Sequence, residues 1–397
     1  MSLVSGASTV EITAQPIQTG SANTEPMSRT ETVAAFTDLY LPTINGVTYT
    51  IQLWRERWRR WRTAMPVVYP AMDDHEAGNG EYPLRSVRAP LYPQYRLGFP
   101  SIPDDLDEHQ PDLVHVHTPF TVGFAGIRYA RKRDLPVIAS YHTLLDDRAN
   151  QHVSGKALDG VKRTCRLYER SFFERVDHVT APTSFARDHL LETVAADVDV
   201  TVVSNGIDTG FFRPVDPTSF RRRYDLPADR PLLGYTGRHG EEKNLEEAVD
   251  AVAETEMTLV LGGDGPAREA LEERASAVDA DVRFLDFLER EELPAFYSSL
   301  DVFVFPSPVE TQGLVALEAT ACGTPVVAVD AGALTDSVIE GETGYRYQQG
   351  SIGDFQWAIT RCLEERGRLA DLCRRRRAML SVEHSIEQLG SIYDGLR

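Results

Sequence analysis

Two glutamates stand where they could do chemistry. Glu310 and Glu318 lie eight positions apart in PVETQGLVALEATACGTPVVAVD, around Gly313 and an apolar run. Acidic residues favour the first turn of a helix, which is a purely structural explanation. However, the free N–H groups of a helix that begins near Gln312 also favour an anion, and this anion would repel both carboxylates unless they met sugar hydroxyls. We therefore expect Glu310 and Glu318 to accept hydrogen bonds from a polyol.

A pair of cations in TGRHGEEKNLEEAV offers complementary chemistry. Arg238 lies on a turn flanked by glycines, and Lys243 follows five residues later, where a helical pattern begins. A guanidinium and an ammonium near a helix N-terminus suit a diphosphate. The alternative is a solvated loop in which Asn244 or Glu241 caps the helix. The chain has only four lysines, and this scarcity favours the diphosphate interpretation.

Short apolar runs must position these side chains. A connector containing Gly, Asp and Pro, residues 206–219, divides the runs into two sets. The expected strands are residues 32–38, 65–70, 112–118, 135–142, 177–183 and 200–205 before the connector, and 231–237, 257–263, 282–287, 301–307 and 324–330 after it. Apolar runs that alternate with longer helical patterns are typical of parallel α/β architecture. We therefore predict an α/β protein with two doubly wound, Rossmann-like domains that face a central cleft.

Polar clusters directly follow many of these predicted strands. TDLYLPTINGV follows the first strand, HTPF the third and YHTLLDD the fourth, while GRHGEEKN, GGDGP and the two glutamates follow strands of the second set. Doubly wound sheets bind ligands at the carboxyl ends of their strands, where the strand order reverses. This placement predicts a ligand cleft between the domains.

The length of 397 residues exceeds what one hydrophobic core usually covers. We expect a disordered extension over 1–30, rich in Ser, Thr, Gly and Ala, in which Met27 is an alternative start. The first domain is predicted over 31–210 and the second over 211–375. A C-terminal helix over 376–397 is expected to pack back toward the first domain. We identify no signal peptide and no apolar run near the roughly 18 residues that span a bilayer.

The composition excludes several classes of function. The chain has 41 basic and 60 acidic side chains and a formal net charge of −19, a balance that suggests adaptation to high salt. With no broad basic stripe, we exclude nucleic acid as a partner.

The cysteines and histidines give no sign of a metal or cofactor site. The four cysteines show no C-x-x-C spacing, and we interpret them as buried or incidental thiols of a cytoplasmic protein. GGDGP lacks the spacing of dinucleotide folds, so we predict no hydride chemistry and no cofactor. His115 and His117 share one strand face, but no third ligand is evident and we predict no metal site.

The motifs, taken together and in order, resemble those of glycosyltransferase family four, whose members have the two-domain GT-B fold. The family loop after the first strand is matched by Asn45-Gly46-Val47. Its Arg-x4-Lys is matched by Arg238 and Lys243, and its Glu-x7-Glu by Glu310 and Glu318. SNGIDTGFFRP is similar to the interdomain segment of the family. These matches extend from about residue 32 to residue 347.

The resemblance implies a nucleotide-sugar donor held mainly by the second domain and an acceptor on the side of the first. Arg238 and Lys243 would neutralise the diphosphate, Glu318 would bind the ribose hydroxyls, and Glu310 would bind the transferred sugar. The other implied roles are donor binding by Asn45, Gly46, Gly313, Leu314 and Val315, sugar contact by His117, and acceptor contact by His142 and Asp146. A neutral buried histidine explains His142 equally well.

The family transfers hexosyl groups with retention of anomeric configuration. The implied mechanism is a front-face displacement in which the leaving phosphate oxygen takes the acceptor proton, without a metal or a protein nucleophile. ETQGL and SYHTLLDD look most like lipid glycosyltransferases of the diacylglycerol glucosyltransferase type. We therefore expect a membrane lipid as acceptor, a UDP-sugar in preference to a GDP-sugar, and a cytoplasmic protein at the inner membrane face. A soluble sugar-phosphate or polysaccharide acceptor is the alternative, and a non-catalytic sugar-nucleotide sensor is a third hypothesis.

The segment VTYTIQLWRERWRRWR predicts a helix with tryptophans on one side. Val47, Ile51, Trp54, Trp58 and Trp61 fall within one stripe at about 100° per residue, which favours packing on the core. The arginines Arg55, Arg57, Arg59, Arg60 and Arg62 would then form the exposed side. Such a basic face on an acidic protein could contact anionic lipid headgroups.

Overall fold

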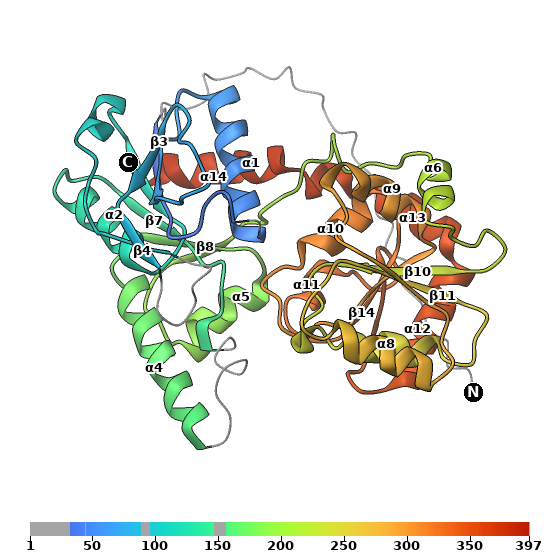
Figure 1. Ribbon diagram of the computed structural model, residues 1–397. Helices are drawn as coiled ribbons and strands as arrows, with labels where there is room; N and C mark the ends of the chain where they lie inside the picture. The colour runs from blue at the N-terminus through green and yellow to red at the C-terminus, as the bar shows by residue number, and fades with distance from the viewer. Residues whose placement is uncertain (1–31, 44, 89–95, 147–155, 397) are drawn as a thin grey trace, which may run out of the picture.

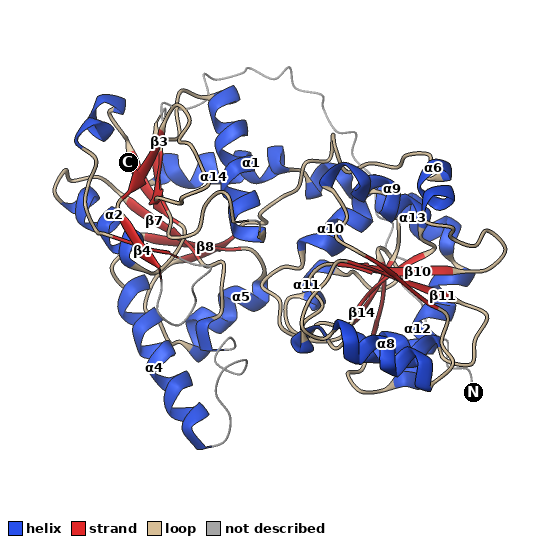
Figure 2. Cartoon of the chain, in the orientation of Figure 1, coloured by secondary structure: helices blue, strands red, loops and turns tan. Residues whose placement is uncertain are grey.

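The computed structural model describes residues 32–43, 45–88, 96–146 and 156–396. The predicted extension over 1–30 lies outside these ranges. Two lobes stand side by side, each built on a parallel sheet with helices on both faces (Figures 1 and 2). The predicted fold class is confirmed. Among the helices within the described ranges, none combines the length and apolar character needed to cross a membrane.

The first lobe contains a parallel sheet of seven strands within the described residues, in the order β3-β2-β1-β6-β7-β8-β9. Its strands are β1 (Val33–Phe36), β2 (Val67–Pro70), β3 (Glu81–Leu84), β6 (Leu113–Val116), β7 (Val137–Ser140), β8 (His178–Ala181) and β9 (Val200–Val202). Its helices are α1 (Gly46–Trp61), α2 (Thr121–Arg131), α4 (Lys156–Phe173) and α5 (Ser184–Asp188). A short antiparallel pair, β4 (Ser86–Arg88) and β5 (Arg96–Gly98), lies beside the sheet.

The second lobe repeats this plan with six described strands, in the order β12-β11-β10-β13-β14-β15. The strands are β10 (Leu232–Thr236), β11 (Thr258–Gly262), β12 (Val282–Leu285), β13 (Val302–Phe305), β14 (Val326–Val329) and β15 (Gly344–Tyr347). The helices are α6 (Thr218–Arg223), α7 (Leu245–Val252), α8 (Arg268–Ala277), α9 (Leu293–Ser299), α10 (Leu314–Ala321), α11 (Leu334–Ser337), α12 (Ile352–Glu364) and α13 (Arg366–Leu380). Its apolar strands read as continuous runs because helices cover both faces of the sheet.

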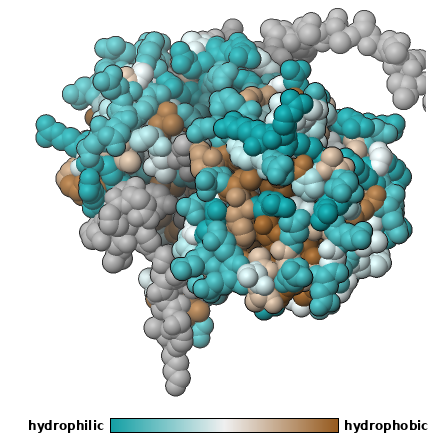
Figure 3. Space-filling view, turned by 45° about the vertical axis from the view of Figure 1, so that its right-hand side comes forward, coloured by the Kyte–Doolittle hydropathy of each residue, from teal (hydrophilic) through white to brown (hydrophobic). Residues whose placement is uncertain are grey.

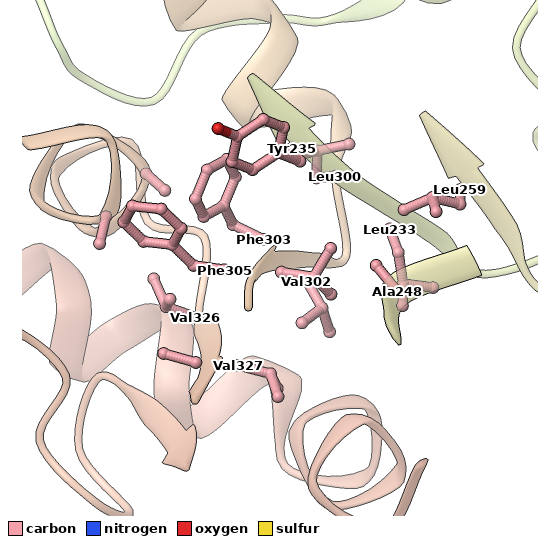
Figure 4. Close-up of a cluster of buried hydrophobic side chains, with 14 of the residues drawn as sticks. Leu233, Tyr235, Ala248, Leu259, Leu300, Val302, Phe303, Phe305, Val326 and Val327 are labelled. Carbon is pink, nitrogen blue, oxygen red and sulfur yellow. The ribbon is translucent and has the colours of Figure 1, made fainter. Parts of the chain in front are cut away.

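The buried core of the second lobe supports the strands that lead to its polar loops. Tyr235 on β10 and Phe303 and Phe305 on β13 pack together with ring centroids 6.0 to 6.2 Å apart (Figure 4). Val326 and Val327 on β14 lie beside them and are fully buried. Hydrophilic residues cover most of the face shown in Figure 3, with hydrophobic residues gathered near its middle. This packed core therefore holds the strand ends, and the polar loops that follow them, in position.

The last helix, α14 (Val382–Gly395), returns to the first lobe and lies beside α1 (Figure 1). Trp58 of α1 meets Tyr393 of α14 with ring centroids 5.2 Å apart. The two crossings between the lobes run together, because Ile207 exchanges main-chain hydrogen bonds with Leu380 and Val382. The two segments that connect the lobes are therefore hydrogen-bonded to each other.

The exposed basic face predicted for α1 is wrong in part. Arg57 is only 6% exposed and forms ion pairs with Asp208 at 2.8 Å and Glu383 at 2.7 Å. Arg55 is largely buried as well and pairs with Glu81 at 2.6 Å. Conversely, Trp61 is 40% exposed, so it does not complete the buried stripe. A buried guanidinium needs partners, and here remote segments supply them.

Candidate active site

Each sheet reverses its strand order once, between β1 and β6 in the first lobe and between β10 and β13 in the second. The predicted residues follow these four strands closely. Asn45 comes after β1, His117 after β6, Arg238 after β10 and Glu310 after β13. The carboxyl ends of such strands border the usual ligand crevice of doubly wound sheets. The four loops therefore lie where a ligand is expected.

Lys243 and Glu310 are brought together by the fold. The Lys243 ammonium lies 2.5 Å from Oε1 of Glu310, and both side chains are 18% exposed. The Ser307 hydroxyl donates to the same oxygen at 2.9 Å. Lys243 ends a short 3-10 helix, η3 (Glu241–Lys243), which leads into α7. An anion that competed for Lys243 would free the Glu310 carboxylate for another donor.

Arg238 lies on the same loop, with a different partner. Its guanidinium pairs with Glu242, and its side chain is 53% exposed. Burial raises the pKa of the Tyr235 hydroxyl, the charge of Glu310 raises it further, and Arg238 lowers it. Arg238 and Glu310 thus both lie within electrostatic reach of this one hydroxyl. Within the described part of the chain, no hydrogen bond or ion pair joins Arg238 to Lys243, Glu310 or Glu318.

Glycines allow the loop of Arg238 to pack against the loop after β11. A β-carbon on Gly263 would lie 2.1 Å from the carbonyl oxygen of Gly237, and φ of Gly263 is +114°. The His239 amide donates to the Asp264 carbonyl at 2.8 Å, which joins the two loops. Only glycine combines this φ with so close an approach of two backbones. The backbone around Arg238 is therefore fixed before any ligand binds.

The N-termini of two helices from different lobes lie close together. Asn45 caps α1 by accepting a hydrogen bond from the Thr48 amide at 3.0 Å. Gly313, with φ of +76°, precedes α10, which begins with Leu314 and Val315. A β-carbon built on Gly46 would lie 3.3 Å from Cδ1 of Leu314. Because both helix starts carry partial positive charge, an anion between them would be stabilised.

Glu318 lies one turn further along α10 and lines a cavity of about 380 Å³ between the lobes. Tyr49 and Gln52 of α1 line the opposite side. The Tyr297 hydroxyl donates to Oε2 of Glu318 at 2.6 Å. Burial raises the pKa of Glu318 to about 7, although the hydrogen bond from Tyr297 and the charge of Arg290 oppose it. A group with so raised a pKa in a cavity is a functional candidate.

Three histidines form a buried stack at the carboxyl ends of β6 and β7. The rings of His115 and His117 lie 4.2 Å apart, and those of His117 and His142 lie 5.5 Å apart. Burial lowers the pKa of His117 well below its ordinary value and that of His142 to about 4. Burial likewise lowers the pKa of His115 to about 3, so all three histidines are neutral at neutral pH. Nε2 of His117 is buried and has no hydrogen-bond partner among the described residues.

Asp146 lies close to this stack in sequence but is held by other partners. Its carboxylate pairs with Arg166 at 2.7 Å and with His189 at 3.2 Å. Burial would raise its pKa, but these two hydrogen bonds prevail and lower the pKa to about 2. The structure therefore places Asp146 in a tightly bonded group, 1% exposed, at the end of the described segment 96–146. Its predicted contact with the acceptor stays a prediction.

Comparison with known proteins identifies the family. The family model described as Glycosyltransferase Family 4 matches residues 44–211, and that described as Glycosyl transferases group 1 matches residues 216–379. The chain belongs to glycosyltransferase family 4. The predicted resemblance to this family is thus confirmed, while the role of each residue stays a prediction.

Relatives of this glycosyltransferase differ in donor and acceptor. It is 28% identical to a GDP-mannose-dependent alpha-mannosyltransferase of Corynebacterium glutamicum, over 79% of this chain and 75% of that protein. It is also 28% identical to an alpha-monoglucosyldiacylglycerol synthase of Streptococcus pneumoniae, over 75% of this chain and 70% of that protein. The Anabaena protein HepE, solved in complex with UDP and glucose, superposes with a TM-score of 0.70 at 19% identity, over 92% of this chain and all of that one. The last likeness confirms the GT-B fold.

Two residues at the site of this glycosyltransferase escaped the sequence reasoning. Gln312 is 4% exposed and accepts from the Asn205 amide at 3.1 Å while donating to the Ser204 hydroxyl at 2.7 Å. Arg290 lies over the ring of Tyr49 at 4.7 Å, across the cavity of Glu318. Both join the two lobes. The partners named here are more than a hundred residues away in the chain, so no local pattern marks these contacts.

The paired histidines raised the question of a metal site in this glycosyltransferase. Within the described residues, no group of three or more His, Cys, Asp or Glu side chains is arranged to hold a metal ion. His115 instead hydrogen-bonds with Tyr393 at 2.6 Å and Ser140 at 2.8 Å. Both of its ring nitrogens are thereby occupied. Its place in the stack is explained by packing and hydrogen bonding.

Proposed function

We propose that this glycosyltransferase moves a hexosyl group from a nucleotide sugar to a membrane lipid, with retention of configuration and without a metal. The observation that carries the proposal is the ion pair of Lys243 with Glu310, which lies on the loop that leads into α10. Lys243 would bind an anion, and the Glu310 carboxylate beside it would bind hydroxyl groups. This is what the diphosphate and the sugar of such a donor require.

The donor would lie across the start of α10. Its diphosphate would draw Lys243 away from Glu310 and would recruit Arg238, whose exposed guanidinium pairs with Glu242. Glu310 would then accept hydrogen bonds from the sugar, and Glu318 from the ribose. Stabilisation of the departing diphosphate by fixed cations is the main catalytic contribution, and loss of one such contact costs about 2–4 kcal/mol. HepE with UDP and glucose supports a donor of this class.

The acceptor side is formed by the first lobe. His117 is neutral, and its buried Nε2 has no hydrogen-bond partner among the described residues, so a sugar hydroxyl that reached this atom could share a hydrogen bond with it without adding charge. The acceptor oxygen attacks the anomeric carbon as the bond from this carbon to the phosphate oxygen breaks. The leaving phosphate oxygen takes the proton of the acceptor hydroxyl. The relative that makes monoglucosyldiacylglycerol supports a lipid acceptor and a glucosyl donor. The mannosyltransferase relative leaves GDP-mannose as the competing donor.

The test measures products directly. The protein is incubated with UDP- and GDP-hexoses and a lipid extract in neutral detergent, and products are analysed by mass spectrometry, with their anomeric configuration determined by NMR. We expect a retained hexosyl lipid with one donor. Lys243→Met and Glu310→Gln should each lose about 10²–10³ in rate, while Glu273→Gln, an exposed change on α8, should not.

Three results would contradict parts of the proposal. Transfer only to soluble sugar phosphates or polysaccharides would exclude the lipid acceptor. Donor binding without transfer or hydrolysis would favour the sensor. Equal losses in Glu310→Gln and Glu273→Gln would show that Glu310 has no special role.

A further inference from the structure

A basic hollow lies on the first lobe, on the outer half of α2 and the end of α4. Its volume is about 320 Å³, and it is lined by Arg128, Arg131, Lys132, Arg175, Phe124 and Ile127. The α2 helix begins just after the cleft end of β6 and runs away from it, so the hollow is remote from Lys243 and Glu310 (Figure 1). Four cations at one place are unexpected in a chain with a net charge of −19.

Three of the four cations of the hollow are held in place by neutral acceptors. Arg131 donates to the main-chain carbonyl of Arg175 at 3.3 Å, and Arg128 donates to the carbonyl of Pro100. Arg175 donates to the Ser171 hydroxyl at 2.7 Å. Within the described residues, none of the four has a carboxylate within 4.0 Å. Neutral acceptors therefore orient the three arginines, while their charge stays available to an anion.

Apolar side chains continue the surface next to the hollow. Phe124 packs against Phe172 and Tyr168 of α4, at ring-centroid distances of 4.9 and 6.2 Å. Leu167 of α4 is 59% exposed and Tyr168 is 37% exposed. Cations beside exposed aliphatic and aromatic side chains suit the boundary between lipid headgroups and acyl chains. A soluble anion would use the cations but would gain nothing from Leu167.

We propose that this surface, the hollow with Leu167 and Tyr168, docks on an anionic phospholipid membrane. The occupant is the layer of phosphate headgroups, whose negative charge would pair with the four cations. This inference names a partner for the proposed lipid-modifying function, and it replaces α1, whose arginines are partly buried and paired. Docking through the first lobe leaves the second lobe free to bind and release the donor.

The experiment measures vesicle binding without donor or acceptor. The full chain is sedimented at low salt with vesicles of phosphatidylcholine alone and of phosphatidylcholine mixed with phosphatidylglycerol. We expect binding only to the anionic vesicles. Lys132→Gln/Arg175→Gln should weaken it about 30-fold, about fivefold for each cation. The matched control, Arg222→Gln/Arg375→Gln, removes the same charge from exposed positions of α6 and α13 and should change it little.

The outcomes separate docking from its alternatives. Cations at the ends of α2 and α4 also interact favourably with the helix dipoles. If that were their whole role, the Lys132/Arg175 variant would melt earlier yet bind vesicles like the wild type, and docking would be wrong. Equal loss in the control variant, or protection by inorganic phosphate without any vesicle binding, would overturn it too. Lys132→Gln alone serves if the double variant does not fold.

The result also stands apart from the proposed enzymatic function. Transfer to an acceptor in neutral detergent needs no charged membrane, so it should be unchanged in Lys132→Gln/Arg175→Gln. Transfer in detergent without vesicle binding would refute only the docking surface. Vesicle binding without transfer would refute only the proposed function.

Discussion

Replacing Glu318 by glutamine tests both the electrostatics of the cavity and the proposed ribose contact. Burial raises the pKa of this carboxyl to about 7 from an ordinary 4.5. Glutamine has the same shape and can still accept the hydrogen bond from Tyr297, so packing is preserved. The substitution therefore changes mainly the buried charge.

The sign and size of the effect follow from proton binding. Below pH 4.5 the carboxyl is protonated in both the folded and the unfolded chain. Between this pH and about 7 only the folded chain keeps its proton, so stability falls as the pH rises. At about 1.4 kcal/mol for each pH unit, the full cost above pH 7 is about 3 kcal/mol, of which about 2 kcal/mol develops between about pH 5.5 and about pH 8.5.

The assay is the free energy of unfolding by urea, measured for both proteins across this pH range. We expect the stability of Glu318→Gln relative to the wild type to increase by about 2 kcal/mol from about pH 5.5 to about pH 8.5. The exposed control Glu273→Gln should show no such trend. Donor affinity should change in the opposite direction and fall about 10- to 100-fold near pH 8, because the lost hydrogen bond is to a charged group. Parallel stability curves for Glu318→Gln and the wild type would refute the reasoning.

Other predictions concern the joint between the lobes, the loop contact and the metal. Gln312→Ala should cost about 2 kcal/mol in unfolding free energy because it leaves the buried Asn205 amide without its acceptor; an unchanged urea midpoint would contradict this. Gly263→Ala should cost about 3 kcal/mol, since its β-carbon would overlap Gly237, whereas Gly353→Ala, in open space, should cost nothing; equal midpoints for both variants would contradict the contact. Transfer should persist in EDTA, because the side chains supply the positive charge; loss restored by a divalent cation would show a metal requirement.

The sequence alone determined the architecture and the family. Apolar runs of strand length form the two parallel sheets because burial on both faces demands continuous hydrophobic segments. The exceptions are at sheet edges. Strand β3 contains Pro83 and is partly exposed, and β15 (Gly344–Tyr347) has no apolar run, so neither was expected. These edge strands are specified by their neighbours more than by their own composition.

The sequence also placed the polar residues of the candidate site after strands that the structure contains. Where a strand ends depends on the local sequence, so the positions of Lys243 after β10 and of Glu310 after β13 could be predicted. Which partners these residues contact is not local. Arg57 was expected in solvent, but it is buried by Asp208 and Glu383, 151 and 326 residues away.

Only the tertiary structure decided the properties that depend on burial. The raised pKa of Glu318, the neutral histidine stack and the bridging role of Gln312 all come from residues distant in the chain. The same is true of the basic hollow, because the ends of α2 and α4 meet only in the folded lobe. Side-chain type and strand order can be read along the chain. Desolvation and charge pairing are set by which segments meet in space.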